Sequence, residues 1–315
     1  MLPKKIILFV LLSAFVTLAA HTATSGNSHN ANPAVPAPPK TNVEPVKETI
    51  NGVEITDPYR WLEDQNSPET RAWINAQNAY TDSLLSKVPG RDVTEKEIAA
   101  LSKIDAMGAP RVENDRYFFS KRSADQDQAS LYMRKGLQGK DELLIDPLPM
   151  SPNHTVTVNL NDVSIDGSML AYSIRQGGAD EVTPHLFDVD AHKDLPDSFP
   201  KGRYAGISLT GDKSAVYYSL VTKEGPRVFV HKVGTNSAND TEIFGKGYGP
   251  EKIISVGVSE DDHYLQITVS HGSADVTELY FQDLKNKGPI VTLVKDLPSG
   301  FFGQIAGDKM YVRTN

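Results

Sequence analysis

Five similar segments follow one another along this chain at a nearly constant interval, and this repeat restricts the fold more than any other feature. Each segment is strand-like and ends on a hydroxyl residue, and these hydroxyl residues lie 53, 46, 49 and 46 positions apart. The segments are Tyr117–Ser120, Leu170–Ser173, Val216–Ser219, Leu265–Thr268 and Met310–Thr314. A β-rich repeat of about 40–50 residues is typical of the blades of a β-propeller.

A second set of apolar–aromatic pairs keeps step with the first set. Its aromatic residues lie 55, 42 and 51 positions apart, so that one pair follows each of the first four segments. The pairs are Leu131-Tyr132, Leu186-Phe187, Val228-Phe229 and Leu279-Tyr280. Two registers that stay in step through four units argue against the alternative, which is a chance similarity among the strands of a β-sandwich.

One unit divides completely into four strands. The predicted strands are Ile253–Ser259, Tyr264–Ser270, Thr277–Leu284 and Pro289–Val294. In the second of these strands, apolar residues alternate with polar residues, as expected when one face of a strand is buried. We therefore expect a mainly β chain in which residues 106–315 form a partial β-propeller with four four-stranded blades and the start of a fifth.

The preceding segment, residues 46–105, is expected to be helical, with helical period from Ser67 onward. Ser67 before a proline predicts a helix start, because serine caps free N–H groups and proline tolerates the first helical position. Apolar residues then recur at three- and four-residue steps over residues 68–88. Asp92–Glu95 has the spacing of a capping box, which predicts a second, shorter helix with an apolar stripe that reaches Ile104. Both stripes are interpreted as packing surfaces.

The chain begins with the three parts of a secretory signal. Lys4 and Lys5 precede the apolar run Ile6–Leu18, and small residues follow this run. We expect a signal peptide over residues 1–20 rather than a membrane anchor, because the run is short for a bilayer. The protein is then expected to be periplasmic or secreted. Residues 21–45, rich in Asn, Ser, Thr, Ala and Pro, predict a flexible low-complexity linker.

Composition and charge exclude several classes of function. The net charge is −8 and no cluster of Lys and Arg stands out, which argues against nucleic acid or a membrane as a partner. The chain has no cysteine, so disulfides, thiolate zinc sites, iron–sulfur clusters and a cysteine nucleophile are excluded. We expect no cofactor.

No serine has the sequence surroundings of an activated nucleophile. A nucleophile elbow needs Gly-x-Ser-x-Gly, because the sharp strand-to-helix turn requires a glycine on each side of the serine. The nearest match, from Gly206 to Gly211 around Ser208, is one residue too long and lies in a predicted strand. We therefore predict no catalytic residue in this chain.

The histidines and acidic pairs offer only weak alternatives. His185 and His192 bracket Asp188 and Asp190, a pattern that a metal site could use. Because no His-Glu-x-x-His helix supports a metal, we interpret the group as a strand that ends in a solvated turn. We interpret His263 as a solvated turn residue and Glu63-Asp64 as a structural element. The glycosylation-like triplets at Asn153 and Asn239 are interpreted as chance matches.

The run Asp57–Asp64, Asp-Pro-Tyr-Arg-Trp-Leu-Glu-Asp, resembles the N-terminal signature of the prolyl oligopeptidase family of serine peptidases. Trp73 and Gln77-Asn78 follow at the distance expected for that family. The segments Gly178–Thr183 and Met310–Asn315 add to the resemblance, which covers everything after the predicted linker.

The resemblance implies an enzyme of two domains. In this family a seven-bladed propeller lies between an N-terminal helical segment and a C-terminal α/β-hydrolase domain, which carries a Ser-Asp-His triad and cleaves peptides after proline. Seven blades at the observed repeat need about 340 residues, more than the chain has left after residue 106. We therefore expect an N-terminal fragment that gates the access of short peptides, lacks the hydrolase domain and is inactive alone.

Two functions of different classes fit these observations. The chain is either the gating part of such an endopeptidase, with short peptides and its own hydrolase domain as partners, or a non-enzymatic propeller module that binds a protein or peptide. Asp57–Asp64 favours the first, since the resemblance places this segment against the hydrolase domain. Specificity for proline, as opposed to the basic residues preferred by close relatives, stays open at this point.

Overall fold

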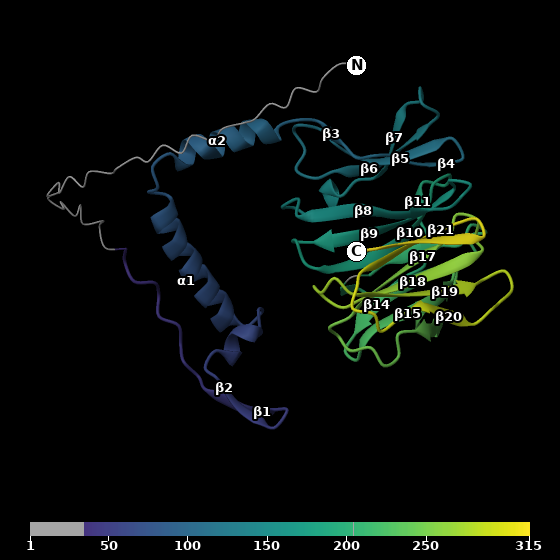
Figure 1. The fold of residues 1–315 in the computed structure, drawn as a ribbon. Coiled ribbons are helices and arrows are strands. Elements are labelled where there is room, and N and C mark those ends of the chain that lie inside the picture. Colours follow the sequence, from purple (N-terminus) through teal and green to yellow (C-terminus); the bar gives the residue numbers. More distant parts are fainter. Residues whose placement is uncertain (1–34, 204) are drawn as a thin grey trace, which may run out of the picture. The chain divides into compact units, whose positions relative to one another are not determined.

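The computed structural model describes residues 35–203 and 205–315 (Figure 1). Contacts divide the chain into two units, Met1–Lys96 and Glu97–Asn315, and each unit is described here by itself. The predicted signal peptide over residues 1–20 and the first part of the predicted linker lie outside the described residues. Within the described part of the chain, no helix is long and apolar enough to cross a membrane.

The first unit contains a hairpin and helices. Strand β1 (Val46–Ile50) pairs antiparallel with β2 (Val53–Asp57), and the short helix η1 (Arg60–Glu63) follows. Helix α1 (Pro68–Leu85) begins as predicted, because the Ser67 hydroxyl accepts a hydrogen bond from the backbone N–H of Thr70 at 3.1 Å. It ends three residues before the predicted limit at residue 88.

Helix α2 (Arg91–Ser102) exists, but the predicted capping box is wrong. The helix begins one residue before Asp92, and the backbone N–H of Thr94 already donates to the Gly90 carbonyl at 3.0 Å. Asp92 therefore lies inside the first turn, where its charge favours the positive end of the helix dipole without capping it. Ile104 lies beyond the last helical residue, so the apolar stripe ends sooner than predicted.

The second unit consists of five antiparallel sheets in chain order, which we call blades 1 to 5. Blade 1 contains β3 (Ala106–Met107), β4 (Arg111–Glu113), β5 (Arg116–Arg122), β6 (Ser130–Lys135) and β7 (Asp141–Ile145). Both β3 and β4 pair with β5, so together they act as one interrupted first strand. Blade 2 contains β8 (Val156–Val163), β9 (Met169–Gln176), β10 (Glu181–Asp188), β11 (Lys193–Asp194) and β12 (Gly202–Arg203).

Blades 3 and 4 have four strands each, and blade 5 has two. Blade 3 contains β13 (Ile207–Leu209), β14 (Ala215–Thr222), β15 (Gly225–Lys232) and β16 (Thr241–Phe244). Blade 4 contains β17 (Ile253–Val258), β18 (Tyr264–Ser270), β19 (Thr277–Asp283) and β20 (Ile290–Val294). Blade 5 contains β21 (Phe301–Ala306) and β22 (Lys309–Thr314). The four predicted strands of the fully divided unit are confirmed, with ends that differ by at most one residue.

The two repeated sets occupy equivalent strands in the blades. The segments of the first set lie in the second strands β5, β9, β14, β18 and β22, and the pairs of the second set lie in the third strands β6, β10, β15 and β19. In blades 1 to 4, both sets therefore mark the middle of a blade, where a strand is paired on both sides.

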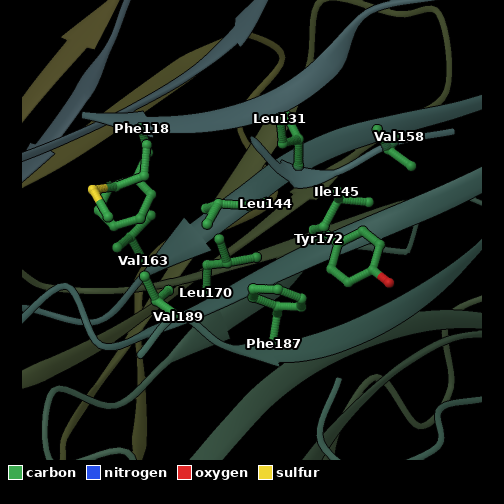
Figure 2. Close-up of a cluster of buried hydrophobic side chains, with 11 residues drawn as sticks. Phe118, Leu131, Leu144, Ile145, Val158, Val163, Leu170, Tyr172, Phe187 and Val189 are labelled. Atoms are coloured by element: carbon green, nitrogen blue, oxygen red, sulfur yellow. The ribbon is translucent and has the colours of Figure 1, made fainter. Parts of the chain in front are cut away.

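Blades 1 to 4 pack face to face on one another in chain order. A cluster between blades 1 and 2 joins Phe118 and Leu144 of blade 1 with Leu170 and Phe187 of blade 2, and Figure 2 shows how these side chains fill the space between the sheets. Equivalent clusters lie between blades 2 and 3 and between blades 3 and 4. Five sheets stacked in chain order confirm the partial propeller and exclude a two-sheet sandwich.

Blade 2 departs from the regular pattern at its outer edge. Its fourth strand is divided into β11 and β12, which both pair with β10. Between them, residues 195–201 leave the sheet, and this segment contributes the buried side chains of Asp197 and Phe199. Phe199 belongs to the apolar cluster between blades 2 and 3.

Candidate functional site at the first-strand turns

The same turn connects the first and second strands in blades 2, 3 and 4. It spans Ser164–Ser168, Thr210–Ser214 and Ser259–His263. In all three turns the first hydroxyl donates to the carboxylate two residues later at 2.7 Å, and this carboxylate accepts the backbone N–H of the fifth residue at 2.9–3.2 Å. These bonds hold the pKa of Asp212 and Asp261 below the usual range.

The fourth residue of each turn has a left-handed backbone, and two of the three blades use a non-glycine residue there. Gly167 has φ 68°, Lys213 has φ 60° and Asp262 has φ 59°. The Lys213 ammonium pairs with the Asp166 carboxylate of the preceding turn and donates to Ser168 Oγ at 2.8 Å. Asp262 Oδ1 accepts the Gly211 N–H at 2.6 Å. In blades 3 and 4, the side chain at this left-handed position therefore connects its turn to the turn of the preceding blade.

Beneath these turns, Asp162 connects the first strands of several blades. Its Oδ2 accepts hydrogen bonds from Ser208 Oγ at 3.0 Å and from the Leu209 N–H at 2.8 Å. Its Oδ1 lies 2.6 Å from an Arg111 guanidinium nitrogen of blade 1. The Val258 N–H of blade 4 donates to Ser208 Oγ at 3.0 Å. One buried carboxylate therefore links blades 1, 2 and 3 directly and blade 4 through the serine.

A cavity of about 300 Å³ opens over this network. Its charged lining residues are Arg111, Glu113, Asp162, Glu260 and Asp262, so that acidic groups predominate. First strands of successive blades contact one another, β8 with β13 and β13 with β17, and therefore lie where the blades converge. In a propeller this is the side of the central channel. The cavity is accordingly the candidate functional site, an acidic recess at one end of the channel wall.

Ser208, the nearest sequence match to a nucleophile, belongs to this network and not to a catalytic arrangement. Its hydroxyl donates to Asp162 and accepts from the backbone of Val258. It lies in the short strand β13, and the residue is buried. A serine whose hydroxyl is committed to a carboxylate and a backbone N–H is a structural link between blades.

The histidine and aspartate residues between 185 and 192 have separate partners. His185 stacks on Tyr172 with ring centres 5.1 Å apart, and burial lowers its pKa. His192 meets the edge of Phe187, and Asp188 Oδ1 accepts the Ala191 N–H at 2.8 Å. Asp190 pairs with Arg116 of blade 1 at 2.7 Å. Among the residues that the structure describes, no group of three or more His, Asp or Glu side chains is placed to hold a metal.

The other interpreted residues make local contacts. The His263 ring stacks on Tyr264 at 4.0 Å, and its Nε2 lies 3.3 Å from Asp283 Oδ1. Glu63 lies 3.4 Å from Arg60, whereas Asp64 accepts the backbone N–H of Asn66 at 3.0 Å. Asn153 accepts the hydroxyl of Thr155 at 2.9 Å, and Asn239 is the last residue of the helix η3 (Ser237–Asn239).

In the signature run, Arg60 is the centre of an ion-pair network. Its guanidinium pairs with Glu48 of β1 and, at 3.0 Å, with Asp57 at the end of β2. The pKa of Asp57 is lowered mainly by the hydrogen bond from the Tyr59 N–H and to a smaller extent by the bond from Arg60. The pKa of Glu48 is lowered by its hydrogen bond with Arg60. The Trp61 carbonyl accepts the hydroxyl of the buried Thr70 at 3.0 Å. The run therefore connects the β1–β2 hairpin to the start of α1.

The last residues of the predicted linker lie along α1. Residues 36–42 have no regular secondary structure, but four side chains donate hydrogen bonds to them. The donors are Trp61 and Trp73 through their indole N–H groups, Gln77 and Tyr80, with distances of 2.6–3.1 Å. The apolar stripe of α1 is consequently half-covered by the chain's own N-terminal segment, a partner that the sequence pattern did not indicate.

Comparison with known proteins decides the family. The sequence model for the "Prolyl oligopeptidase, N-terminal beta-propeller domain" matches residues 38–315. The chain belongs to the prolyl oligopeptidase family. It is 30% identical over 311 residues to a prolyl endopeptidase of Elizabethkingia meningoseptica, covering 95% of this chain and 44% of that protein. A prolyl endopeptidase of Elizabethkingia miricola is 28% identical, with 96% and 44% covered.

Solved structures of prolyl oligopeptidases have the same fold. A prolyl endopeptidase from a structural and mechanistic study of two such enzymes superimposes with a TM-score of 0.76 at 29% identity, covering 88% of this chain and 42% of that one. Prolyl oligopeptidase B of Galerina marginata, bound to a 35-residue substrate, matches with a TM-score of 0.70 at 21% identity, covering 88% and 44%. This chain thus spans less than half the length of the relatives that it matches.

Sequence reasoning missed Asp162, which is the most connected residue of the site. The only local signal is an acidic residue directly before the apolar end of a strand. The pairing of β8 with β9 shifts register between Leu160 and Asp162. Such a bulge redirects the side chains that follow it. The partners of Asp162, which are Arg111 and Ser208, lie about one blade repeat away in the sequence, so the sequence alone could not show that they meet this carboxylate.

Proposed function

We propose that this chain is the N-terminal propeller part of a secreted or periplasmic serine endopeptidase that cleaves short peptides after proline. The observation that carries the proposal is the family match over residues 38–315, together with relatives named prolyl endopeptidase over nearly the whole chain. Because the chain spans 44% of those relatives, the catalytic triad is assigned to a C-terminal α/β-hydrolase domain of the full-length protein.

The propeller's role in this proposal is to limit which substrates reach the catalytic groups. The turns at one end of the first strands are tied to one another through Lys213, Asp262 and Asp162, so that the wall of the channel is braced against widening. An extended peptide can enter a narrow channel, whereas a folded protein cannot. Size selection follows from the rigidity of the wall and needs no specific recognition.

The first unit's role is to dock on the hydrolase domain. The hairpin β1–β2 exposes the apolar side chains of Ile50, Val53 and Ile55 to 47%, 62% and 42%. The Arg60 network holds the hairpin and the start of α1 in one arrangement. A preformed, partly apolar surface of this kind is suited to cover another domain.

A chimeric enzyme tests the proposal. Residues 35–315 would replace the matched N-terminal part of the Elizabethkingia meningoseptica prolyl endopeptidase, and hydrolysis of a short chromogenic peptide with proline before the cleaved bond would be measured. We expect activity on this peptide and little cleavage of an unfolded protein such as casein. The same chimera without its nucleophilic serine is the control. A folded but inactive chimera would favour the alternative of a propeller that only binds a partner.

Export requires a separate experiment. Residues 1–45 would be fused to a reporter enzyme in a Gram-negative host, and the location and length of the product would be determined. We expect a shortened, periplasmic reporter. A matched fusion with Lys4 and Lys5 replaced by Glu should be exported less, because the positive start of a signal peptide is removed. A full-length cytoplasmic product from the unmodified fusion would contradict the proposed location.

A further inference from the structure

A buried histidine of blade 3 lies between two carboxylates. The His231 side chain is completely buried in strand β15. Its Nε2 lies 2.8 Å from Asp197 Oδ1, and its Nδ1 lies 2.7 Å from Asp240 Oδ1. The two carboxylate side chains are only 1% and 3% exposed. Asp197 comes from the segment 195–201 of blade 2, so the contact joins two blades.

The other partners of the two carboxylates are also donors. The Tyr218 hydroxyl donates to Asp240 Oδ2 at 2.9 Å, and the Gly234 N–H donates to Asp197 Oδ1 at 2.6 Å. The Phe199 ring meets the imidazole edge-on with ring centres 4.8 Å apart. Among the described residues, neither carboxylate forms an ion pair with a lysine or arginine. The imidazole is therefore the group that can balance their charge.

A neutral imidazole between two ionised carboxylates would leave one of the two contacts without a proton. A neutral imidazole has one N–H donor and one acceptor nitrogen, and an ionised carboxylate can only accept. With both ring nitrogens facing carboxylate oxygens, a neutral ring would leave a nitrogen lone pair against an oxygen lone pair at hydrogen-bond distance. A ring that is protonated on both nitrogens donates to each carboxylate and satisfies both contacts. The ring rather than a carboxyl group holds this proton, because imidazole is the stronger base.

We propose that His231 is kept as the doubly protonated imidazolium and that this proton fastens the segment 195–201 of blade 2 to blade 3. Loss of the proton removes one of the two donated bonds and leaves two negative charges buried beside a neutral ring. The segment then separates from blade 3 more readily and exposes Phe199. The contact is a local, pH-sensitive fastening that opens as the pH rises.

The sign and the size of the effect follow from one proton. The closed cluster binds one proton more than the opened, solvated groups do at neutral to alkaline pH, so closure is favoured at low pH and lost as the pH rises. One proton limits the change in the opening equilibrium constant to about tenfold per pH unit. Tyr218 faces the cluster as well, and the pKa of its hydroxyl is raised by burial and by Asp240, so it stays protonated in this interval.

The chain supplies a matched control in blade 2. There the Tyr172 hydroxyl donates to Asp194 Oδ1 at 2.9 Å, as Tyr218 does to Asp240 in blade 3. The two tyrosines and the two aspartates are each 46 positions apart. Asp194 has no hydrogen bond with a histidine among the described residues. Asp194→Asn therefore makes the same chemical change without touching the imidazole.

Asp240→Asn is the decisive variant. An asparagine can accept the Tyr218 hydroxyl with its oxygen and donate its amide N–H to His231 Nδ1, so that a neutral ring satisfies every contact. In ¹⁵N NMR spectra of the full chain at neutral pH, we expect both His231 ring nitrogens to carry a proton. The Asp240→Asn variant should show one protonated ring nitrogen, and Asp194→Asn should show two.

Hydrogen exchange provides a second, independent measurement. Protection factors of amides in residues 195–201 should fall as the pH rises above neutrality, by at most about tenfold per unit, and should change less than about twofold in Asp240→Asn. Asp194→Asn should retain the dependence of the unaltered chain. A singly protonated His231 in the unaltered chain at neutral pH would overturn the proposal, even if the variant failed to fold. Equal pH dependence with and without Asp240→Asn would also overturn it.

Discussion

Asp162 of blade 2 accepts a hydrogen bond from Ser208 of blade 3 at 3.0 Å, and this bond joins two first strands that are 46 positions apart in the sequence. The same carboxylate accepts the Leu209 N–H and pairs with Arg111 of blade 1. Because the residue is only 8% exposed, water cannot replace these partners when one of them is lost. The wall of the channel therefore depends on one acidic side chain.

Replacement of Asp162 should destabilise the propeller. Asp162→Ala leaves a serine hydroxyl and a backbone N–H without an acceptor, and we expect a loss of about 2–4 kcal/mol in the free energy of unfolding. Urea denaturation followed by fluorescence measures this loss. Asp190→Ala is the control, because Asp190 also pairs with an arginine of blade 1 but is 60% exposed. It should cost less than about 1 kcal/mol, and equal losses would contradict the assigned role of Asp162.

The repeated turns should make the chain sensitive to acid. The pKa of Asp212 is lowered by the Ser214 N–H and by the hydroxyls of Thr210 and Ser214. A lowered folded-state pKa contributes stability above the unfolded value, near 3.9, and this contribution is lost as the pH falls further. The urea midpoint should therefore decrease below about pH 4. The decrease should be smaller in Asp212→Asn and unchanged in Asp308→Asn, an exposed residue of the blade 5 turn. A slope that Asp212→Asn leaves unaltered would show that this turn does not contribute.

The segment 36–42 should determine the environment of both tryptophans. Trp61 donates to the Asn42 carbonyl and Trp73 donates to the Thr41 hydroxyl, at 3.1 and 3.0 Å. The chain has two tryptophans, so its emission reports on these contacts alone. A chain that begins at residue 43 should emit at longer wavelength and be quenched more by acrylamide than one that begins at residue 35. Identical spectra would mean that the segment does not hold the rings in solution.

The purified chain should neither hydrolyse a proline-containing chromogenic peptide nor react with a serine-directed phosphonate. The sequence predicts no activated serine and no oxyanion donors, and without such groups nothing stabilises the tetrahedral intermediate. The serine nearest to the required pattern, Ser208, is buried and hydrogen-bonded between blades. Mass spectrometry after incubation with the phosphonate gives the measurement, and the chimera described above is the positive control. Stoichiometric labelling of any serine in the chain would refute this expectation.

Local sequence patterns predicted a strand well where the alternation of apolar and polar residues corresponds to the burial of one face of that strand. Strand β18 has the predicted bounds, and Leu265, Ile267 and Val269 are completely buried, because alternation places one face of the strand against blade 3. In blade 2, Ala171 and Tyr172 are both buried because both faces of β9 are covered by neighbouring blades. The alternating pattern did not predict this second kind of strand, because burial of both faces depends on the blades that pack on either side.

Local patterns predicted the helices less accurately at their ends. The Ser67 cap was found because its donor, Thr70, lies three residues away in the same segment. The start of α2 was misplaced because the spacing of Asp92 and Glu95 occurs equally well inside a first turn. The cover over α1 was missed because three of the four acceptors in residues 36–42 are backbone carbonyls, which carry no signature of residue type.

The sequence by itself indicated the family through its motifs, and it indicated the order of the blades and their second and third strands, because hydrophobic period and turn chemistry act over a few residues and recur with every blade. The tertiary structure alone decided which polar groups meet. Asp162 reaches Arg111 and Ser208, and His231 lies between Asp197 and Asp240, because stacked blades bring together residues from different repeats. Whether two buried charged groups meet depends on the distance between them in the stacked blades, and no spacing along the sequence gives that distance.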